Sequence, residues 1–345
     1  MKAAGIIIVL FFVIGTLIAV GGLVFNTQLL SRNQEKTQGP AGEGGVLISE
    51  NGGAFASIES LGGLEVKTIE FSRNPEVVYL GAKYYGLWVS QNGGKKFVPA
   101  KDKLLKNIVD IYDIEESPSG DLYLAAYREN RGSVIYATAG KAPVETYFSQ
   151  IARFGVFGVA AENARTVSFV SSDGGFYRSI NTGKSWEVRS RGKEGLLKLR
   201  RSANGIVWAV TSENKILRSA DAGKTWTDAS ITKKSSSRIP IHDLYLDQRT
   251  GTLLASSNKL YRSTDGGTTW QALNLIIPPD NITVNTTAIH PTSSNIIYAA
   301  SGNILYKTVD GGESWSITTL PTARTVTAIA INPRNPDTIL IGTEK

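Results

Sequence analysis

STDGGTTW at residues 263–270 and TVDGGESW at residues 308–315 are two nearly identical copies of one motif. Each copy places a Ser or Thr two residues before an Asp, which is followed by two Gly and, at the end, a Trp. The Asp side chain can accept hydrogen bonds from backbone N–H groups in a tight turn, and Gly adopts positive φ angles at low cost. The Trp offers a large flat surface for packing. The motif therefore predicts a braced turn that is followed by a packed aromatic side chain.

Copies of this motif recur along the chain at intervals of about 40–45 residues. Looser copies are SENGGAF (49–55), SQNGGKKF (90–97), SINTGKSW (179–186) and SADAGKTW (219–226). A seventh, eroded copy, IYATAGK at 135–141, lies in a gap of about twice the usual interval. Short β-branched and aromatic runs separate the copies, and long amphipathic helices are not visible. The repeat therefore predicts an all-β chain that is built from similar units.

A second signal recurs once per interval, as a short turn between two β-rich runs. These turns are found at 73–75, 117–120, 162–164, 203–205, 249–251, 290–292 and 332–334. The last turn precedes no motif copy, because the sequence around it, up to 339–345, supplies only the first two strands of a new cycle. The other two strands of that cycle are found at the front of the repeat region, starting at 46–49. Joining these halves leaves no long free edge. We therefore predict a seven-bladed β-propeller over residues 44–345, with four strands per blade and a two-plus-two strand closure.

The amino-terminal segment has a different character, with an apolar run from Ala3 to Phe25 that is preceded by Lys2. The run is long enough to span a bilayer, and no small-x-small cleavage site follows it. We therefore predict an uncleaved transmembrane signal anchor at 1–25, with a cleavable signal peptide as the alternative, and a flexible linker at 26–43. The flanking charges predict a single-pass protein of the cell membrane, with a cytoplasmic amino terminus and the propeller on the extracytoplasmic side.

The composition excludes several kinds of site. The chain has no Cys and two His, which excludes disulfides, thiolate metal ligands and cysteine nucleophiles and disfavours a histidine-rich metal centre. We expect no cofactor and no metal. The formal net charge of +7 indicates an acidic partner or surface.

The repeated Asp of the motif resembles a catalytic or calcium-binding carboxylate, but its distribution favours a structural role. Equivalent turns on separate blades are spread around a ring, and three of the copies carry Asn instead. We expect the aromatic residue of each copy to fill space against the next blade. The residues predicted to brace the blades are Asn51, Asn92, Asn181, Asp221, Asp265, Asp310, Trp186, Trp226, Trp270 and Trp315.

The motif resembles the Asp-box, or BNR, repeat of sialidases, xyloglucan-degrading glycosidases, sortilin-type receptors and photosystem II assembly-factor-like propellers. The resemblance covers residues 44–345 and is closest to the assembly-factor-like and sortilin-type propellers, with an architecture like that of WD40 or YVTN repeats. It implies the fold. It leaves the function open, because these repeats occur in both enzymes and binding proteins.

The predicted binding surface lies opposite the boxes. In a propeller the boxed turns occupy one face, while the connections between blades and between second and third strands form the other, usual binding face. Basic and aromatic residues in these connections predict contact with an acidic surface of another envelope or membrane protein; a solvated rim of charge is the alternative. The predicted partner-binding residues are Lys83, Tyr84, Tyr85, Arg128, Arg131, Arg189, Arg191, Lys193, Lys233, Lys234 and Arg238.

A glycoside hydrolase or glycan-binding propeller, similar to sialidases or xyloglucanases, is the alternative function. Glycosidases need two carboxylates that converge across a cleft. The loops of the predicted binding face show no such pair, so we assign no catalytic residue. Nucleic acid is disfavoured as a partner, because no stacking platform accompanies the basic residues. The sequence thus favours a non-catalytic protein-binding module.

Overall fold

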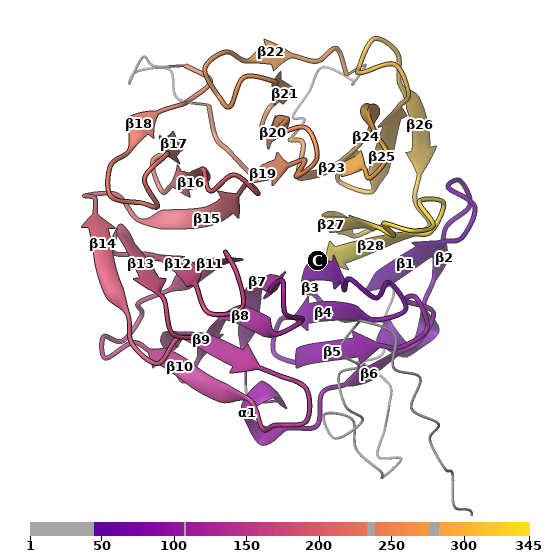
Figure 1. Ribbon diagram of the computed structural model, residues 1–345. Helices are drawn as coiled ribbons and strands as arrows, with labels where there is room; N and C mark the ends of the chain where they lie inside the picture. Colours follow the sequence, from indigo (N-terminus) through magenta and orange to yellow (C-terminus); the bar gives the residue numbers. More distant parts are fainter. Residues whose placement is uncertain (1–44, 107, 233–238, 276–282) are drawn as a thin grey trace, which may run out of the picture.

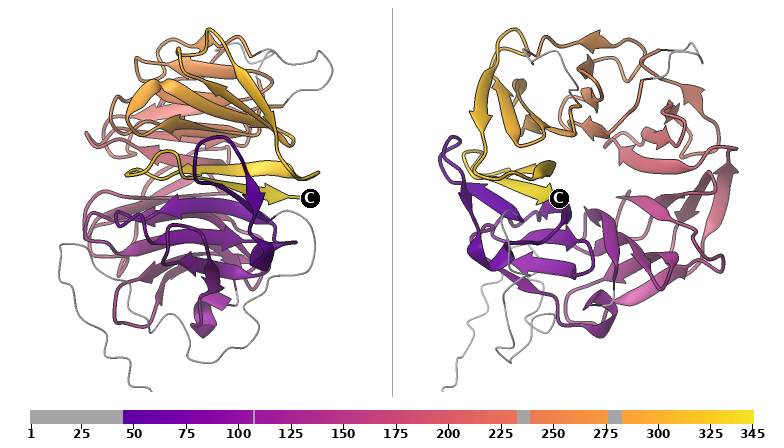
Figure 2. Two further views of the ribbon diagram at one scale, coloured as in Figure 1. Left: turned by 90° about the vertical axis from the view of Figure 1, so that its right-hand side faces the viewer. Right: turned by 180° about the vertical axis from the view of Figure 1, so that it is seen from behind.

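The described chain folds into seven four-stranded antiparallel sheets, which stand as blades around a central channel (Figure 1). The structure is a computed structural model and describes residues 45–106, 108–232, 239–275 and 283–345. The innermost strands of successive blades contact one another in a closed ring, which is visible from behind in Figure 2. The predicted all-β, seven-bladed propeller is confirmed.

Each blade runs from an inner to an outer strand in chain order, except the closing blade. Blade 1 contains β3 (Val66–Phe71), β4 (Val78–Ala82), β5 (Gly86–Ser90) and β6 (Phe97–Pro99). Blade 2 contains β7 (Asp110–Glu116), β8 (Leu122–Arg128), β9 (Arg131–Ala137) and β10 (Val144–Phe148). Blade 3 contains β11 (Val156–Ala161), β12 (Val167–Ser171), β13 (Gly175–Ser179) and β14 (Glu187–Arg191).

The remaining blades follow the same plan. Blade 4 contains β15 (Leu196–Arg201), β16 (Val207–Thr211), β17 (Ile216–Ser219) and β18 (Thr227–Asp228). Blade 5 contains β19 (Asp243–Leu246), β20 (Leu253–Ser256), β21 (Leu260–Ser263) and β22 (Gln271–Ala272). Blade 6 contains β23 (Thr286–His290), β24 (Ser293–Ser301), β25 (Ile304–Thr308) and β26 (Ser316–Thr319). The closing blade contains β27 (Thr325–Ile331), β28 (Ile339–Glu344), β1 (Val46–Ser49) and β2 (Ala56–Ser57).

Helices are short in the part of the chain that the structure describes. They are α1 (Lys103–Lys106) and a 3-10 turn at Glu59–Leu61. Among these residues no helix has the length and apolar character needed to cross a membrane. The predicted anchor at 1–25 and linker at 26–43 lie outside the described residues.

The closing blade joins the two ends of the described chain. Strand β1 pairs with β28 in antiparallel register, which sets Val46 opposite Gly342 and Leu47 opposite Ile341. In Figure 1 the first strands, in indigo, lie beside the last strands, in yellow. The predicted two-plus-two closure is thereby confirmed, and no sheet edge is left open between the first and last blades.

The boxed turns are held by hydrogen bonds within a few residues. The Ser263 hydroxyl donates to Asp265 Oδ1 at 2.8 Å and accepts from the Gly267 amide at 2.8 Å. Asp265 Oδ1 also accepts from the Thr269 amide at 2.9 Å. The amide oxygen of Asn181 receives the Ser185 N–H in the same way, at 3.0 Å. The neutral amide oxygen of Asn therefore accepts the same hydrogen bond as the carboxylate of Asp, which explains why Asn replaces Asp in three copies.

The aromatic residues of the boxes pack in the direction opposite to the prediction. Trp186 Nε1, in blade 3, donates to the Thr146 carbonyl of blade 2 at 2.9 Å, and Trp270 Nε1 donates to the Ala229 carbonyl, which follows the last strand of blade 4, at 2.8 Å. Each indole thus reaches the preceding blade and not the next one. A repeat in the sequence orders the blades along the chain, but the twist of the sheets decides toward which neighbour an outer strand leans.

Replacing a buried residue of the closing blade should destabilise the whole ring. Ile341 is fully buried and packs with Leu47, Tyr298 and Ile339, so Ile341→Ala should lower the free energy of unfolding by about 2–5 kcal/mol, measured by chemical denaturation. Ile317 is 54% exposed, and Ile317→Ala should change it by less than about 0.5 kcal/mol. Equal effects of the two substitutions would contradict this account of closure.

Candidate functional site

The two faces of the propeller carry different connections. Successive turns of an antiparallel sheet alternate between its ends, so the boxed turns share one end with the turns between first and second strands. We call this the box face. The turns between second and third strands and the connections between blades form the opposite end, which we call the loop face.

The structure brings the described predicted residues together mainly on blades 1 to 3. Lys83, Tyr84 and Tyr85 form the β4–β5 turn on the loop face, and Arg128 and Arg131 end the β8–β9 hairpin. Arg189 and Arg191 lie in β14, and Lys193 lies in the connection to blade 4. Lys233, Lys234 and Arg238 lie outside the described residues.

Several of these cations have carboxylate partners within the protein. The N–O distances are 2.9 Å for Lys83 with Glu65, 3.2 Å for Arg128 with Glu145, 3.2 Å for Arg189 with Glu187 and 3.0 Å for Arg191 with Asp173. Arg128 also pairs with the adjacent Glu129. Arg131 lies over the Phe148 ring, with 5.5 Å between its guanidinium carbon and the ring centroid. Lys193 is exposed and forms no ion pair with any described residue. The net positive charge of this face is therefore smaller than its cations alone indicate.

The β4–β5 turn combines exposed aromatic surface with backbone strain. The side chains of Tyr84 and Tyr85 are 66% and 45% exposed. Tyr84 has a φ of 64°, a left-handed conformation that is costly for a bulky residue. The Tyr84 amide donates a hydrogen bond to the Val109 carbonyl in the connection between blades 1 and 2, which holds the turn in place. Strained residues of this kind cluster at functional sites.

Charged residues of the inner strands meet in the central channel. Asp113 accepts a hydrogen bond from the Val159 amide at 3.1 Å and lies 3.6 Å from Arg200 Nη1. Lys198 Nζ lies 3.1 Å from Asp243 Oδ1, which links blades 4 and 5. The Lys198–Asp243 pair connects neighbouring inner strands, whereas the Asp113–Arg200 pair reaches past blade 3, from blade 2 to blade 4.

Two further carboxyl groups of the channel, Glu70 and Glu115, form no ion pair with any described residue. The Glu115 side chain is half-buried, whereas the Glu70 side chain is exposed. The protein around the channel disfavours the charged form of both groups, and the nearby carboxylates, Asp113 among them, add repulsion, so the pKa of each rises to about 8. The pKa of Asp243 moves the other way. Burial opposes its ionisation, but Lys198 and Arg200 outweigh this effect and lower the pKa of Asp243.

Sequence reasoning missed these channel residues, although a signal was present. The inner strands alternate polar and apolar side chains, as in Asp-Ile-Glu at 113–115, Lys-Leu-Arg at 198–200 and Asp-Leu-Tyr at 243–245. Successive side chains of a strand point to opposite sides. Polar residues at alternate positions of each first strand therefore indicate a polar inner wall.

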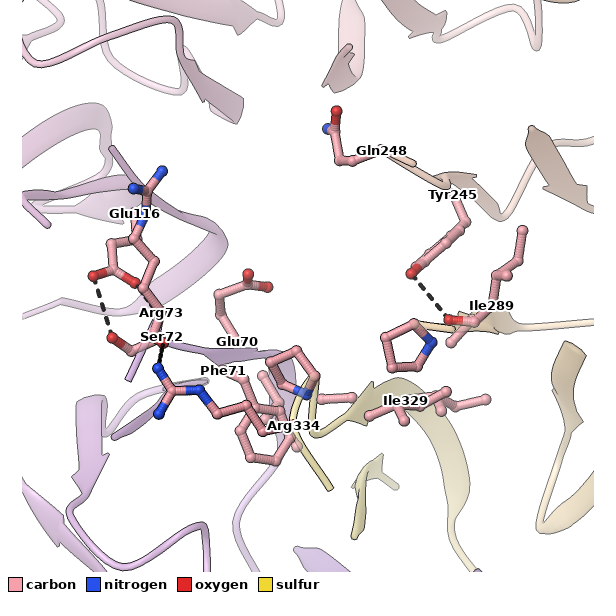
Figure 3. A pocket seen from close by; sticks show the side chains of 16 residues that line it. Glu70, Phe71, Ser72, Arg73, Glu116, Tyr245, Gln248, Ile289, Ile329 and Arg334 are labelled. Carbon is pink, nitrogen blue, oxygen red and sulfur yellow. Dashed lines mark hydrogen bonds between the residues drawn. The ribbon is translucent and has the colours of Figure 1, made fainter. Parts of the chain in front are cut away.

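A pocket of about 600 Å³ opens at the box-face end of the channel (Figure 3). Its walls mix polar and apolar side chains, and Figure 3 shows Glu70 and Glu116 across the pocket from Tyr245. Glu116 accepts hydrogen bonds from the Ser72 hydroxyl at 3.2 Å and the Arg73 amide at 2.8 Å. The pocket thus contains one carboxylate held by donors and a second carboxyl group with a raised pKa. Among the described residues no group of three or more acidic or histidine side chains is arranged to hold a metal ion.

Comparison with known proteins finds a family model that matches the last part of the chain and solved structures of similar fold. The family model described as "Sortilin, neurotensin receptor 3" matches residues 258–345. YCF48 from Cyanidioschyzon merolae superposes with a TM-score of 0.65 at 15% identity, over 81% of this chain and 95% of its own. The fold of this chain is a seven-bladed propeller, and its boxed turns resemble the Asp-box repeat. Comparison with curated protein sequences finds no match.

Two other solved structures illustrate the range of this fold. YCF48 bound to D1 peptide has a TM-score of 0.64 at 16% identity, over 82% of this chain and 94% of that chain. The GH74 xyloglucanase from Xanthomonas campestris has a TM-score of 0.68 at 16% identity, over 81% of this chain and 51% of the enzyme. At such identities the likeness concerns the fold alone.

The channel carboxyls should make stability fall as the pH rises. The folded state holds protons on Glu70 and Glu115 up to about pH 8, whereas the unfolded chain releases them near pH 4.5, so the free energy of unfolding should decrease between these values. The double variant Glu70→Gln/Glu115→Gln should have a flatter profile and be more stable than the wild type at pH 8. Denaturant titrations from pH 4.5 to pH 8.5 measure this.

The matched control for this experiment is Glu76→Gln, which replaces an exposed glutamate outside the channel. It should leave the slope of stability against pH unchanged. A double variant with the wild-type slope would refute the assignment of retained protons to the channel.

Proposed function

We propose that this protein is a membrane-anchored, non-catalytic binding module, similar in role to an assembly factor, which holds another membrane or envelope protein on its loop face. The observation that carries the proposal is the exposed pair Tyr84 and Tyr85 on a strained turn of that face. Large aromatic side chains dominate the energy of protein interfaces, because they bury much area with few rotatable bonds.

The charge of the loop face fits an acidic partner. Lys83 Nζ lies 5.2 Å from the centroid of the Tyr84 ring, so a positive charge accompanies the aromatic surface. Lys193 adds an exposed cation without an internal ion-pair partner among the described residues. Complementary charge guides association and selects partners more than it adds affinity. We therefore assign the affinity mainly to the tyrosines and the selection of acidic surfaces to the cations.

The comparisons support a binding role without deciding it. A propeller of similar fold, YCF48, has been solved with a bound D1 peptide. A propeller of similar fold also occurs in an enzyme, the GH74 xyloglucanase from Xanthomonas campestris. The proposal for this chain therefore depends on its own loop-face residues.

The location of the propeller is part of the proposal. The apolar run at 3–25 and its flanking charges support an anchor with the propeller on the extracytoplasmic side of the membrane. In a bacterial host, fusing alkaline phosphatase to the carboxyl terminus reports the side, because that enzyme is active only outside the cytoplasm. An inactive but stable fusion would argue against this location.

Removing the aromatic pair should abolish most partner capture. Tyr84→Ala/Tyr85→Ala should reduce recovery of the cross-linked partner at least about tenfold, because two exposed anchors of the interface are lost. The measurement is quantitative mass spectrometry after cross-linking the tagged full-length protein in its native membrane.

The matched control is Ile180→Ala/Val309→Ala, which removes two apolar side chains of the box face, each 64% exposed. It should recover the partner at the wild-type level. Equal recovery by both double variants would refute a binding role for the tyrosine turn.

A second candidate function, glycan hydrolysis or binding, is favoured by the box-face pocket. Glu70 has a pKa of about 8, so it carries a proton at neutral pH, whereas Glu116 is held by hydrogen-bond donors. Two carboxyl groups whose environments differ in this way can divide the roles of acid and base. The pocket of about 600 Å³ offers room for a sugar unit beside them.

Enzyme assays separate the two candidates. Under the proposed binding function, the full-length protein should hydrolyse none of a panel of chromogenic glycosides and xyloglucan oligosaccharides. Turnover that is abolished by Glu70→Gln, and retained by the control Glu76→Gln, would replace the binding function with glycoside hydrolysis.

A further inference from the structure

A second pocket, of about 330 Å³, lies on the loop face between blades 3 and 4. Its apolar part is formed by Leu196, Leu217 and Trp226, and its rim carries Gly192, Lys193 and Lys215. The volume is sufficient for one large side chain of another protein.

The way in which Trp226 is held differs from that of the neighbouring box tryptophans. Trp186 and Trp270 donate to backbone carbonyls of the preceding blade, whereas Trp226 Nε1 donates to the Ser190 hydroxyl at 2.9 Å. Ser190 itself lines the pocket. The indole therefore keeps its polar atom satisfied while part of its surface lines the pocket.

The rim of the pocket is built from hydrogen-bonded backbone. The Gly192 amide donates to the Gly174 carbonyl at 2.9 Å, and the Ser212 amide donates to the Gly195 carbonyl at 2.8 Å. These bonds fix both ends of the short connection between the blades. A pocket that exists before binding reduces the loss of conformational freedom on association.

The cations at the rim differ in whether they have a carboxylate partner. Lys215 pairs with Glu194, and Arg191 pairs with Asp173, so both of these cations are neutralised within the protein. Lys193 is exposed and has no carboxylate partner among the described residues. The site thus combines an apolar cavity with one cation that is available to an incoming group.

We propose that this pocket receives an aromatic or large aliphatic side chain of the partner protein, while an adjacent Asp or Glu of the partner pairs with Lys193. The inference rests on the proposed binding function and names its anchor site. The complementary charge favours an acidic peptide segment as the occupant. The apolar walls require that the segment also present a large hydrophobic residue.

The pocket contact and the Lys193 ion pair should contribute unequally to the affinity for the partner. A side chain buried in a pocket is the typical dominant contact of an interface, so blocking the pocket should weaken binding at least about tenfold. An exposed ion pair contributes little, which corresponds to about a two- to fivefold loss for Lys193→Glu.

Gly192→Phe blocks the pocket with little risk to the fold. A Cβ added at Gly192 would meet no atom closer than 3.9 Å, and the backbone there is not left-handed. Gly53→Phe is the matched control, because its Cβ has the same 3.9 Å clearance in a boxed turn on the opposite face. Lys141→Glu, which changes an exposed lysine between β9 and β10, is the control for Lys193→Glu.

The probe is a fluorescein-labelled peptide, Ser-Asp-Asp-Phe-Asp-Asp-Ser, titrated with the full-length protein in mild detergent and followed by fluorescence anisotropy. It should bind more tightly than versions with Ala in place of Phe or Lys in place of Asp. Gly192→Phe and Lys193→Glu should weaken binding by the factors above, and the two controls should bind as the wild type. Absence of binding, indifference to the central Phe, or equal behaviour of Gly192→Phe and Gly53→Phe would overturn the proposal.

The same variants distinguish this inference from the proposed function. Partner capture in membranes that depends on Tyr84 and Tyr85 but not on Gly192 or Lys193 would overturn the pocket and leave the binding function standing. Peptide binding at the pocket without tyrosine-dependent capture would overturn Tyr84 and Tyr85 as the main contacts and leave the pocket as the binding site.

Discussion

The pairing of β1 with β28 is the constraint on which the rest of the propeller depends. A single blade exposes an unpaired edge and an unburied face, and only a closed ring buries both. The register is specific, because a shift by one residue would turn Leu47 and Ile341 out of the core. Once this pairing forms, the positions of all inner strands around the channel follow from it.

Closure also forces charged side chains of the inner strands into one channel. Two ion pairs, Asp113 with Arg200 and Lys198 with Asp243, offset part of the free-energy cost of taking these charges out of water. Glu70 and Glu115 form no such ion pair with any described residue, and their raised pKa values favour the protonated form instead. The ring is thus held mainly by the hydrogen bonds between strands and by the hydrophobic clusters of the blades, while its channel collects the charged side chains.

The two faces have different physical characters. Box-face turns use their polar side chains internally, as Asp265 and Asn181 do, so little of this chemistry remains for a ligand. The loop face keeps exposed aromatic surface at Tyr84. It also carries the exposed Lys193, which has no ion-pair partner in the described part of the chain, beside a pocket with apolar walls. The box-face pocket, which has the greater volume of the two, is lined by Glu70 and Glu116 and is the place where a catalytic site would lie under the alternative function.

The amino-acid sequence by itself determined the number of blades, the role of the boxed turns and the split closing blade. These features follow from hydrogen bonds between residues two to four positions apart, and from a repeat that can be recognised along the sequence. Only the tertiary structure decided that Trp186 reaches backward to blade 2 and that Arg128 and Arg191 are already paired. It alone brought Glu70 near Glu115, because contacts between blades depend on twist and ring closure, which no local pattern encodes.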